Sequence, residues 1–273
     1  MPTTPILTSN NDHQGGTNNS TNSINDPVLV DMKPYPLPIP WSKTALIMID
    51  MQADFLNEGG FGEALGNDVS QLRKAIPPCQ ALLEAARNCG LTILHTREGH
   101  RPDLSDLHPH KRHRPGSRQP TIGQPGPFGR ILVRGEPGHD IISDLYPLPT
   151  ETVIDKPGKG SFYATDLECI LRAQNITTLL VCGVTTEVCV HTTVREANDR
   201  GYHCIVIEDA CASYTPHFHD VAIEMVWKQG GLFGSVTDST SLIQAMMKKQ
   251  PTKKKDEEDA PEPEPASKKA RQT

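Results

Sequence analysis

The stretch "LLVCGVTTEVCVHTTVREANDRG", residues 179–201, decides the fold because it joins an apolar run to a helical pattern through Gly183. A near-continuous apolar run is typical of a parallel strand that is covered on both faces. The pattern at 186–200 predicts a helix that ends at Gly201. This strand–turn–helix unit carries Cys189 in the first turns of its helix.

The same alternation of apolar runs and helical patterns extends along the chain. The predicted strands are 44–50, 91–95, 152–155, 177–183, 203–209 and 231–236. The predicted helices are about 69–89, 165–174, 186–200, 216–229 and 238–248. The order predicts right-handed crossovers and a three-layer αβα sandwich around a mostly parallel central sheet.

The domain boundaries follow from changes in composition. Residues 1–27 are rich in Asn, Thr, Ser and Gly, and 248–273 segregate basic, acidic and Pro-Glu blocks, so both are predicted to be disordered tails. The domain between them is 28–247. The segment 97–150, dense in Pro, Gly, His and Arg, is expected to cover part of a pocket or to pack between subunits.

Composition limits the classes of partner. The 273-residue chain has a formal net charge of -6 and no apolar run near the roughly 20 residues that span a bilayer, so no nucleic acid or membrane partner is expected. Its seven cysteines are odd in number and lack metal-type spacing, and its N-terminus lacks a secretory signal. We therefore expect a cytoplasmic setting, with the basic clusters of the last tail as an alternative nuclear address.

Three predicted strands lead to reactive side chains: Asp50, Lys156 and Cys189. Ligands of parallel α/β sheets bind beyond the carboxyl ends of the strands, so these groups are expected to converge. A helix N-terminus and an ammonium group favour the thiolate, and Asp50 could move the proton. Amides of Thr185 and Cys189 could hold an oxyanion, which together describes acyl transfer through a thioester. Each signal alone is weak, since an isolated cysteine is usually an inert core residue.

The stretches "TALIMIDMQADF", "VIDKPGKGSFYATDLECILRAQNI" and "LLVCGVTTEVCVHTTVREANDRGYHCIVIEDACAS" resemble the isochorismatase-like cysteine hydrolase superfamily over about residues 43–246. The resemblance implies the catalytic triad Asp50, Lys156 and Cys189 and a cis peptide between Val184 and Thr185. It also implies a homo-oligomer, a dimer or a tetramer, and no cofactor or metal.

Within that superfamily the chain is most similar to biuret, triuret and ureidoacrylate amidohydrolases, through "KPGKGSFYATDL" and "KQGGLFG". Cys189 argues against isochorismate hydrolysis itself. The similarity implies that Lys159 and Gln229 contact a small amide or ureide substrate and that Phe55 forms an aromatic wall.

Three alternatives remain at this stage. A nicotinamidase-type enzyme would bind a metal, for which Glu98, His100, His108 and His110 are the candidate ligands. A catalytically idle interaction domain would use its tails. A thiol redox sensor would use Cys189, although no resolving cysteine is evident, because Cys182 belongs to a strand.

Overall fold

The computed structural model describes residues 28–112 and 119–248. The predicted tails at 1–27 and 249–273, with their nuclear address, lie outside the described residues. A small antiparallel hairpin, β1 (Leu29–Val30) with β2 (Leu37–Pro38), precedes the main sheet. No helix in the described part of the chain is long and apolar enough to cross a membrane.

The main sheet has six strands in the order β10-β9-β8-β3-β4-β7, and every neighbouring pair is parallel. The strands are β3 (Thr44–Ile49), β4 (Thr92–Glu98), β7 (Thr152–Lys156), β8 (Thr178–Val184), β9 (His203–Ala212) and β10 (Ser235–Thr237). All six overlap a predicted strand. The predicted parallel sheet is therefore confirmed, and the chain runs outward from β3 in both directions.

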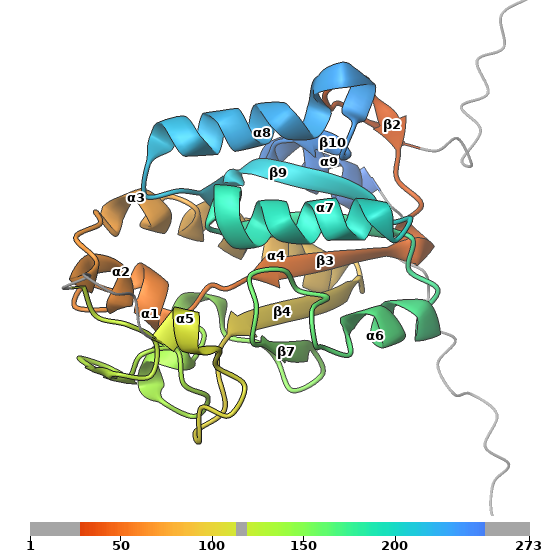
Figure 1. Cartoon of the computed structure of the whole chain (residues 1–273). Helices are drawn as coiled ribbons and strands as arrows, with labels where there is room; N and C mark the ends of the chain where they lie inside the picture. The colour runs from red at the N-terminus through yellow and green to blue at the C-terminus, as the bar shows by residue number, and fades with distance from the viewer. Residues whose placement is uncertain (1–27, 113–118, 249–273) are drawn as a thin grey trace, which may run out of the picture.

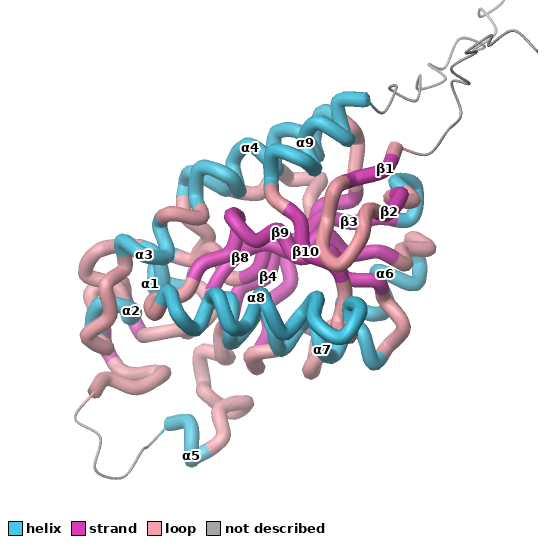
Figure 2. The backbone as a smooth tube through the Cα atoms, turned by 90° about the horizontal axis from the view of Figure 1, so that it is seen from above, coloured by secondary structure: helices cyan, strands magenta, loops and turns pink. Residues whose placement is uncertain are grey.

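Helices cover both faces of the sheet, as a three-layer sandwich requires (Figures 1 and 2). On one face lie α4 (Ile76–Asn88) and α9 (Ser239–Lys248). On the other lie α6 (Leu167–Ala173), α7 (His191–Asp199) and α8 (Pro216–Gly231). Short elements gather near the ends of β3 and β4: α1 (Ala53–Leu56), α2 (Phe61–Ala64), α3 (Ser70–Arg73) and α5 (Pro109–Arg112).

Remaining short elements lie in the connections. They are η1 (Trp41–Lys43), β5 (Pro125–Gly126), β6 (Gly129–Arg130), η2 (Pro137–His139), η3 (Ser143–Leu145) and η4 (Thr186–Val190), the last a π-helical turn.

Two predicted boundaries were wrong. The helix expected at 69–89 is divided into α3 and α4, because the prolines in the first turn of α4 have no N–H to continue the earlier helix. The strand expected at 231–236 begins only at Ser235, because α8 runs to Gly231. Gly234 then turns the chain at a φ of 142°, where a Cβ would lie 2.2 Å from the Cys204 carbonyl oxygen.

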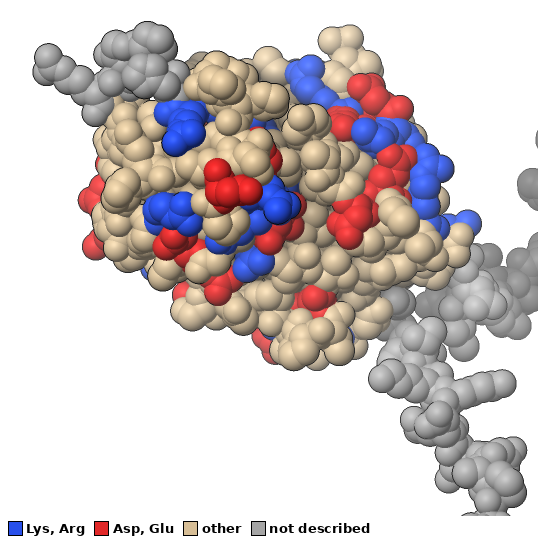
Figure 3. All heavy atoms as spheres, turned by 60° about the horizontal axis from the view of Figure 1, so that its bottom comes forward, with Lys and Arg blue, Asp and Glu red and all other residues tan. Residues whose placement is uncertain are grey.

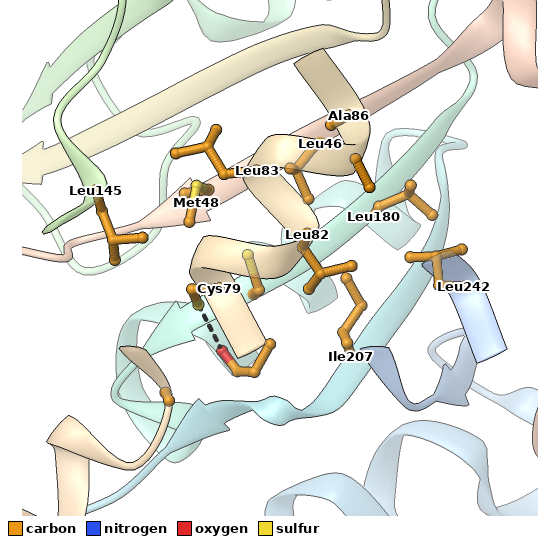
Figure 4. Packing of buried hydrophobic residues seen from close by; sticks show 14 of the residues in the cluster. Leu46, Met48, Cys79, Leu82, Leu83, Ala86, Leu145, Leu180, Ile207 and Leu242 are labelled. Atoms are coloured by element: carbon orange, nitrogen blue, oxygen red, sulfur yellow. Dashed lines mark hydrogen bonds between the residues drawn. The ribbon is translucent and has the colours of Figure 1, made fainter. Parts of the chain in front are cut away.

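Each face of the sheet has its own apolar core. Figure 4 shows the α4 face, where Leu82 and Leu83 pack with Leu46, Leu180 and Leu242. The other core joins alternate residues of the same strands, such as Ile47 and Val181, to α6, α7 and α8. Alternation along the strands thus divides the core, and the predicted near-continuous apolar runs supply both halves.

An ion-pair network lies at the C-terminal end of α4. Arg87 donates from Nε and Nη2 to the two carboxylate oxygens of Glu151, at 2.7 and 2.9 Å. His95 Nε2 lies 3.0 Å from the same carboxylate, and the Leu148 amide donates to it. Burial alone would raise the pKa of Glu151, but the bonds from Arg87, Leu148 and His95 outweigh it and hold the pKa at about 2.

A buried hydrogen bond joins the segment after β4 to α1. The Asp54 carboxylate, which is buried, accepts a hydrogen bond of 2.9 Å from the Leu132 amide. A Cβ at Gly138 would lie 2.3 Å from the same carboxylate, so only glycine lets the two segments approach.

On the face shown in Figure 3, basic and acidic side chains are intermingled rather than separated into areas of one sign.

Candidate active site

Asp50 and Lys156 meet at the carboxyl edge of the sheet. Asp50 follows β3 with a φ of 52°, and Lys156 is the last residue of β7, two strands away. Their charged atoms, Nζ and Oδ2, are 2.7 Å apart, and both side chains have no exposed surface. Thr96 on the intervening strand β4 donates its hydroxyl to Asp50 Oδ1 at 2.7 Å. The ion pair is therefore fixed from both sides.

Lys156 uses its remaining donors on the turn that follows it. Its Nζ donates to the carbonyl oxygens of Gly158 and Lys159, both at 2.9 Å. The ammonium group is therefore held by two carbonyl oxygens and by its ion pair with Asp50. Burial alone would lower the pKa of Lys156, but the charges of Asp50 and Glu98 raise it above its ordinary value. Lys156 therefore stays charged, and it positions Asp50.

Cys189 enters the site through a sharp turn after β8. Gly183 has a φ of 117°, and a Cβ there would lie 2.1 Å from the Ile49 carbonyl oxygen, so only glycine lets β8 pass β3 at this point. The Val184–Thr185 peptide is cis, as the resemblance implies. The π-helical turn η4 then carries Cys189 toward the ends of β3 and β4, where it is 4% exposed.

Glu98, the last residue of β4, completes the cluster. The Cys189 thiol donates to Glu98 Oε2 at 3.6 Å, and Lys159 Nζ lies 2.6 Å from Glu98 Oε1. Gln52 fixes the backbone of Glu98, because its side chain accepts from the Glu98 amide at 2.7 Å and donates to the Glu98 carbonyl at 2.9 Å. The site thus contains two carboxylates, two ammonium groups and one thiol.

The electrostatics of the cluster correct one expectation. Burial raises the pKa of the Cys189 thiol well above its ordinary value, and Lys156 and Lys159 oppose this rise while Asp50 and Glu98 add to it. The thiol is therefore protonated at neutral pH, whereas the sequence predicted a thiolate. The physical reason is that two nearby carboxylates and full desolvation outweigh the lysines.

Glu98 itself remains ionised. Burial alone would raise its pKa, but the charges of Lys159 and Lys156 outweigh burial and lower the pKa below its ordinary value. The same pairing raises the pKa of Lys159, although burial alone would lower it. A carboxylate and an ammonium group therefore stand side by side next to the thiol.

One cluster of the described residues has the side-chain types that bind a metal ion. Within the described residues, ligand atoms of Asp50, Glu98 and Cys189 lie within 4.8 Å of one another. Each carboxylate already holds a lysine ammonium, so a cation at this position would have to displace Lys156 and Lys159.

The histidines of the nicotinamidase alternative are not part of that cluster. His100 turns to Asp106, with Nδ1 and Oδ1 3.3 Å apart, and His108 stacks on His110. None of these three histidines therefore belongs to the described cluster of Asp50, Glu98 and Cys189.

The predicted substrate residues fall in different places. Lys159, with 44% of its side chain exposed, lines a pocket of about 380 Å³. Phe55 is half-buried and packs against the core on the α4 face. Gln229 is exposed at a kink near the C-terminal end of α8, and the chain after it approaches the amino-terminal end of β9, where Gly234 lies against the Cys204 backbone. The structure therefore brings Lys159 to the site and leaves Gln229 away from it.

Several site residues were missed from the sequence. Glu98 was considered only as a metal ligand, yet it follows the strand-end rule that identified Asp50. Phe61 and Lys111 line the pocket beside Lys159. Nothing local in the sequence distinguishes Phe61 from Phe55. The prediction that the segment 97–150 covers part of a pocket is confirmed, since Lys111 and Ile122 belong to it.

Cys182 does not belong to this site. It packs on the α4 face of the sheet, whereas Cys189 packs in the core on the other face. The Cys79 side chain and burial together raise the pKa of Cys182 well above the ordinary value. The sheet separates the two thiols, so Cys182 is not placed to resolve an oxidised Cys189.

The fold and the site define a three-layer α/β domain with an acid, a lysine and a thiol at the carboxyl edge of its parallel sheet. The family model of the isochorismatase domain matches residues 44–241, which is more than half of the chain. The chain therefore belongs to the isochorismatase family, and the predicted family is confirmed.

Relatives and solved structures agree with this assignment. A ureidoacrylate amidohydrolase, RutB, of Yersinia enterocolitica is 30% identical over 77% of this chain and 92% of its own length. RutB of Cronobacter sakazakii is 30% identical over 80% of this chain and 95% of its own length. The crystal structure of a cysteine hydrolase from Pseudomonas syringae pv. phaseolicola superposes with a TM-score of 0.66 at 28% identity, covering 81% of this chain and 97% of that one.

Proposed function

We propose that the protein is a cysteine-dependent amidohydrolase that cleaves a C–N bond of a small linear amide or ureide of the biuret, triuret or ureidoacrylate type. The single observation that carries this proposal is the buried Asp50–Lys156 pair beside the Cys189 thiol. The names of the relatives, which are ureidoacrylate amidohydrolases, support the substrate class.

In the first half-reaction, the Cys189 sulfur attacks the substrate carbonyl while Asp50 takes the thiol proton. Because the raised pKa keeps the thiol protonated, a base beside it is needed when the C–S bond forms. Asp50 then gives this proton to the leaving nitrogen, the C–N bond breaks, and a thioester on Cys189 remains. Amides of Thr185 and Cys189 hold the oxyanion.

In the second half-reaction, Asp50 removes a proton from water, and the hydroxide attacks the thioester carbonyl. The C–S bond breaks, and the proton returns to the Cys189 sulfur as the acid or carbamate departs. Lys156 is a positioning residue, because it is buried and its ammonium group is held by Asp50 and by the Gly158 and Lys159 carbonyls.

The Glu98–Lys159 pair can bind the part of a ureide that lies beyond the carbonyl attacked by Cys189. The carboxylate can accept from ureide N–H groups, and the ammonium can donate to a carbonyl oxygen. Lys159 is exposed in the pocket and Glu98 lies behind it, so the pair can exchange its mutual contact for contacts with substrate.

The test is ammonia release by the purified protein beside its Cys189→Ala variant. The substrates are biuret, triuret, ureidoacrylate, N-carbamoyl amino acids and nicotinamide. We expect turnover of a ureide by the wild type and none by the variant, with matching thermal unfolding as evidence that the variant is folded. Retained activity in Cys189→Ala contradicts the mechanism, and turnover of nicotinamide alone contradicts the substrate class.

A further inference from the structure

The pocket at Lys159 is also lined by Lys111, a positive charge that is not part of the catalytic cluster. The pocket measures about 380 Å³, and the described residues that line it include Phe61, Leu65, Ile122, Lys111 and Lys159. No described lining residue is acidic. Apolar side chains and two lysines therefore line a pocket that adjoins the catalytic cluster through Lys159, which pairs with Glu98.

The charges behind the pocket cancel. Asp50 is paired with Lys156 at 2.7 Å, and Glu98 is paired with Lys159 at 2.6 Å. Among the described lining residues Lys111 is a further cation, and no ion pair joins it to a described carboxylate. A bound molecule with one negative charge would balance this charge, whereas a neutral molecule would leave it unpaired.

Lys111 is held close to the substrate lysine. Its Nζ donates to the Pro157 carbonyl oxygen at 3.3 Å, and Pro157 directly follows Lys156 in the turn that carries Lys159. A lysine ammonium has three donors, so two remain for a ligand. Both lysines line the same pocket, which sets two donor groups at separate points along it.

We infer that Lys111 binds the carboxylate of a ureido acid, so that the enzyme prefers anionic ureido acids to neutral ureides such as biuret. The inference rests on the proposed function, because it assigns the second end of the same substrate. The ureide end contacts Lys159 and Glu98, and the carboxylate end contacts Lys111. The apolar side chains of Phe61, Leu65 and Ile122 suit the short carbon linker between the two ends.

The experiment compares ureidoacrylate with ureidoacrylamide, in which an uncharged amide replaces the carboxylate. Cleavage of the ureido group is followed by chromatography, so ammonia from the second amide does not interfere. The preference is the ratio of kcat/KM for the two compounds. Wild type, Lys111→Gln, Lys111→Glu and the matched control Lys74→Gln are compared, since Lys74 is an exposed lysine outside the pocket.

We expect the wild type to prefer ureidoacrylate. Lys111→Gln should lower the preference about 10- to 100-fold, as expected for one charge-assisted hydrogen bond, and mainly through KM. Lys111→Glu should lower it further, and Lys74→Gln should leave it unchanged. Added salt should reduce the wild-type preference, since the lysine is partly exposed.

The outcomes separate the two proposals. If the wild type cleaves the ureides without preference, or if Lys111→Gln keeps the wild-type ratio, the role of Lys111 is wrong and the proposed function stands. If the wild type cleaves neither compound nor biuret, the proposed function is wrong and the inference falls with it. Equal loss of preference in Lys74→Gln would also overturn the inference, because the effect would then come from net charge alone.

Discussion

Replacement of Lys156 by methionine measures how strongly the site depends on its buried ion pair. Methionine keeps an unbranched stem but removes the charge, so Asp50 is left buried with only the Thr96 hydroxyl as a donor. Removing one partner of a buried pair typically costs about 3–5 kcal/mol of unfolding free energy. For a domain of this size, that loss lowers Tm by roughly 6–20 °C.

The assay is urea denaturation at pH 7 of wild type, Lys156→Met, Asp50→Asn and the double variant. Each single variant leaves one buried polar group without its partner, and the double variant removes that mismatch. We therefore expect the double variant to lose less than the sum of the two single losses, with a coupling of about 2 kcal/mol or more.

The matched control is Lys74→Met, which changes an exposed lysine and should stay within about 0.5 kcal/mol of wild type. The reasoning is refuted if Lys156→Met unfolds within about 1 kcal/mol of wild type. It is also refuted if the losses of the two single variants simply add, because the pair would then have no mutual energy.

Three further predictions concern stability and the thiol. Glu151→Gln should lower the free energy of unfolding by about 1–3 kcal/mol at pH 7. The difference from wild type should vanish as pH falls from about 4.5 toward 2, because the lowered pKa of Glu151 stabilises the fold only while this carboxylate is ionised. Equal differences in urea denaturation at pH 7 and pH 2 would contradict this. Gly183→Ala should prevent accumulation of folded protein or lower Tm by more than 10 °C, since its Cβ would meet the β3 backbone; a wild-type melting curve refutes the close approach. The rate at which iodoacetamide alkylates Cys189 should still increase with pH above pH 9, because the thiol pKa is raised. Peptide mass spectrometry measures this rate, with exposed Cys169 as the reference. A rate that is already constant at pH 7 would indicate a preformed thiolate.

The sheet and the acid–lysine–thiol cluster could be predicted from the sequence, because each depends on local order. Apolar runs of strand length give the strands, and the residue that follows such a run lies at the carboxyl edge. Asp50, Lys156 and Cys189 were found in this way, and the structure brings all three together.

The protonation state and the pocket wall could not be predicted in this way, because both depend on contacts between distant segments. Burial and the charges of Asp50 and Glu98 determine the Cys189 pKa, and no local pattern reports them. Lys111 reaches the pocket only through the path of the long segment after β4. Gln229 was placed by similarity alone, and it lies at the kink of α8, after which the chain approaches the amino-terminal end of β9.

The decisive measurement is mass spectrometry of wild-type protein quenched in acid during its first turnover of ureidoacrylate. We predict an acyl or carbamoyl group on the peptide that contains Cys189, which appears and then disappears as substrate is consumed. The other six cysteines should stay unmodified, and Cys189→Ala should carry no adduct. Complete turnover with Cys189 unmodified at every time point, together with activity in Cys189→Ala, would contradict a thioester mechanism at this residue.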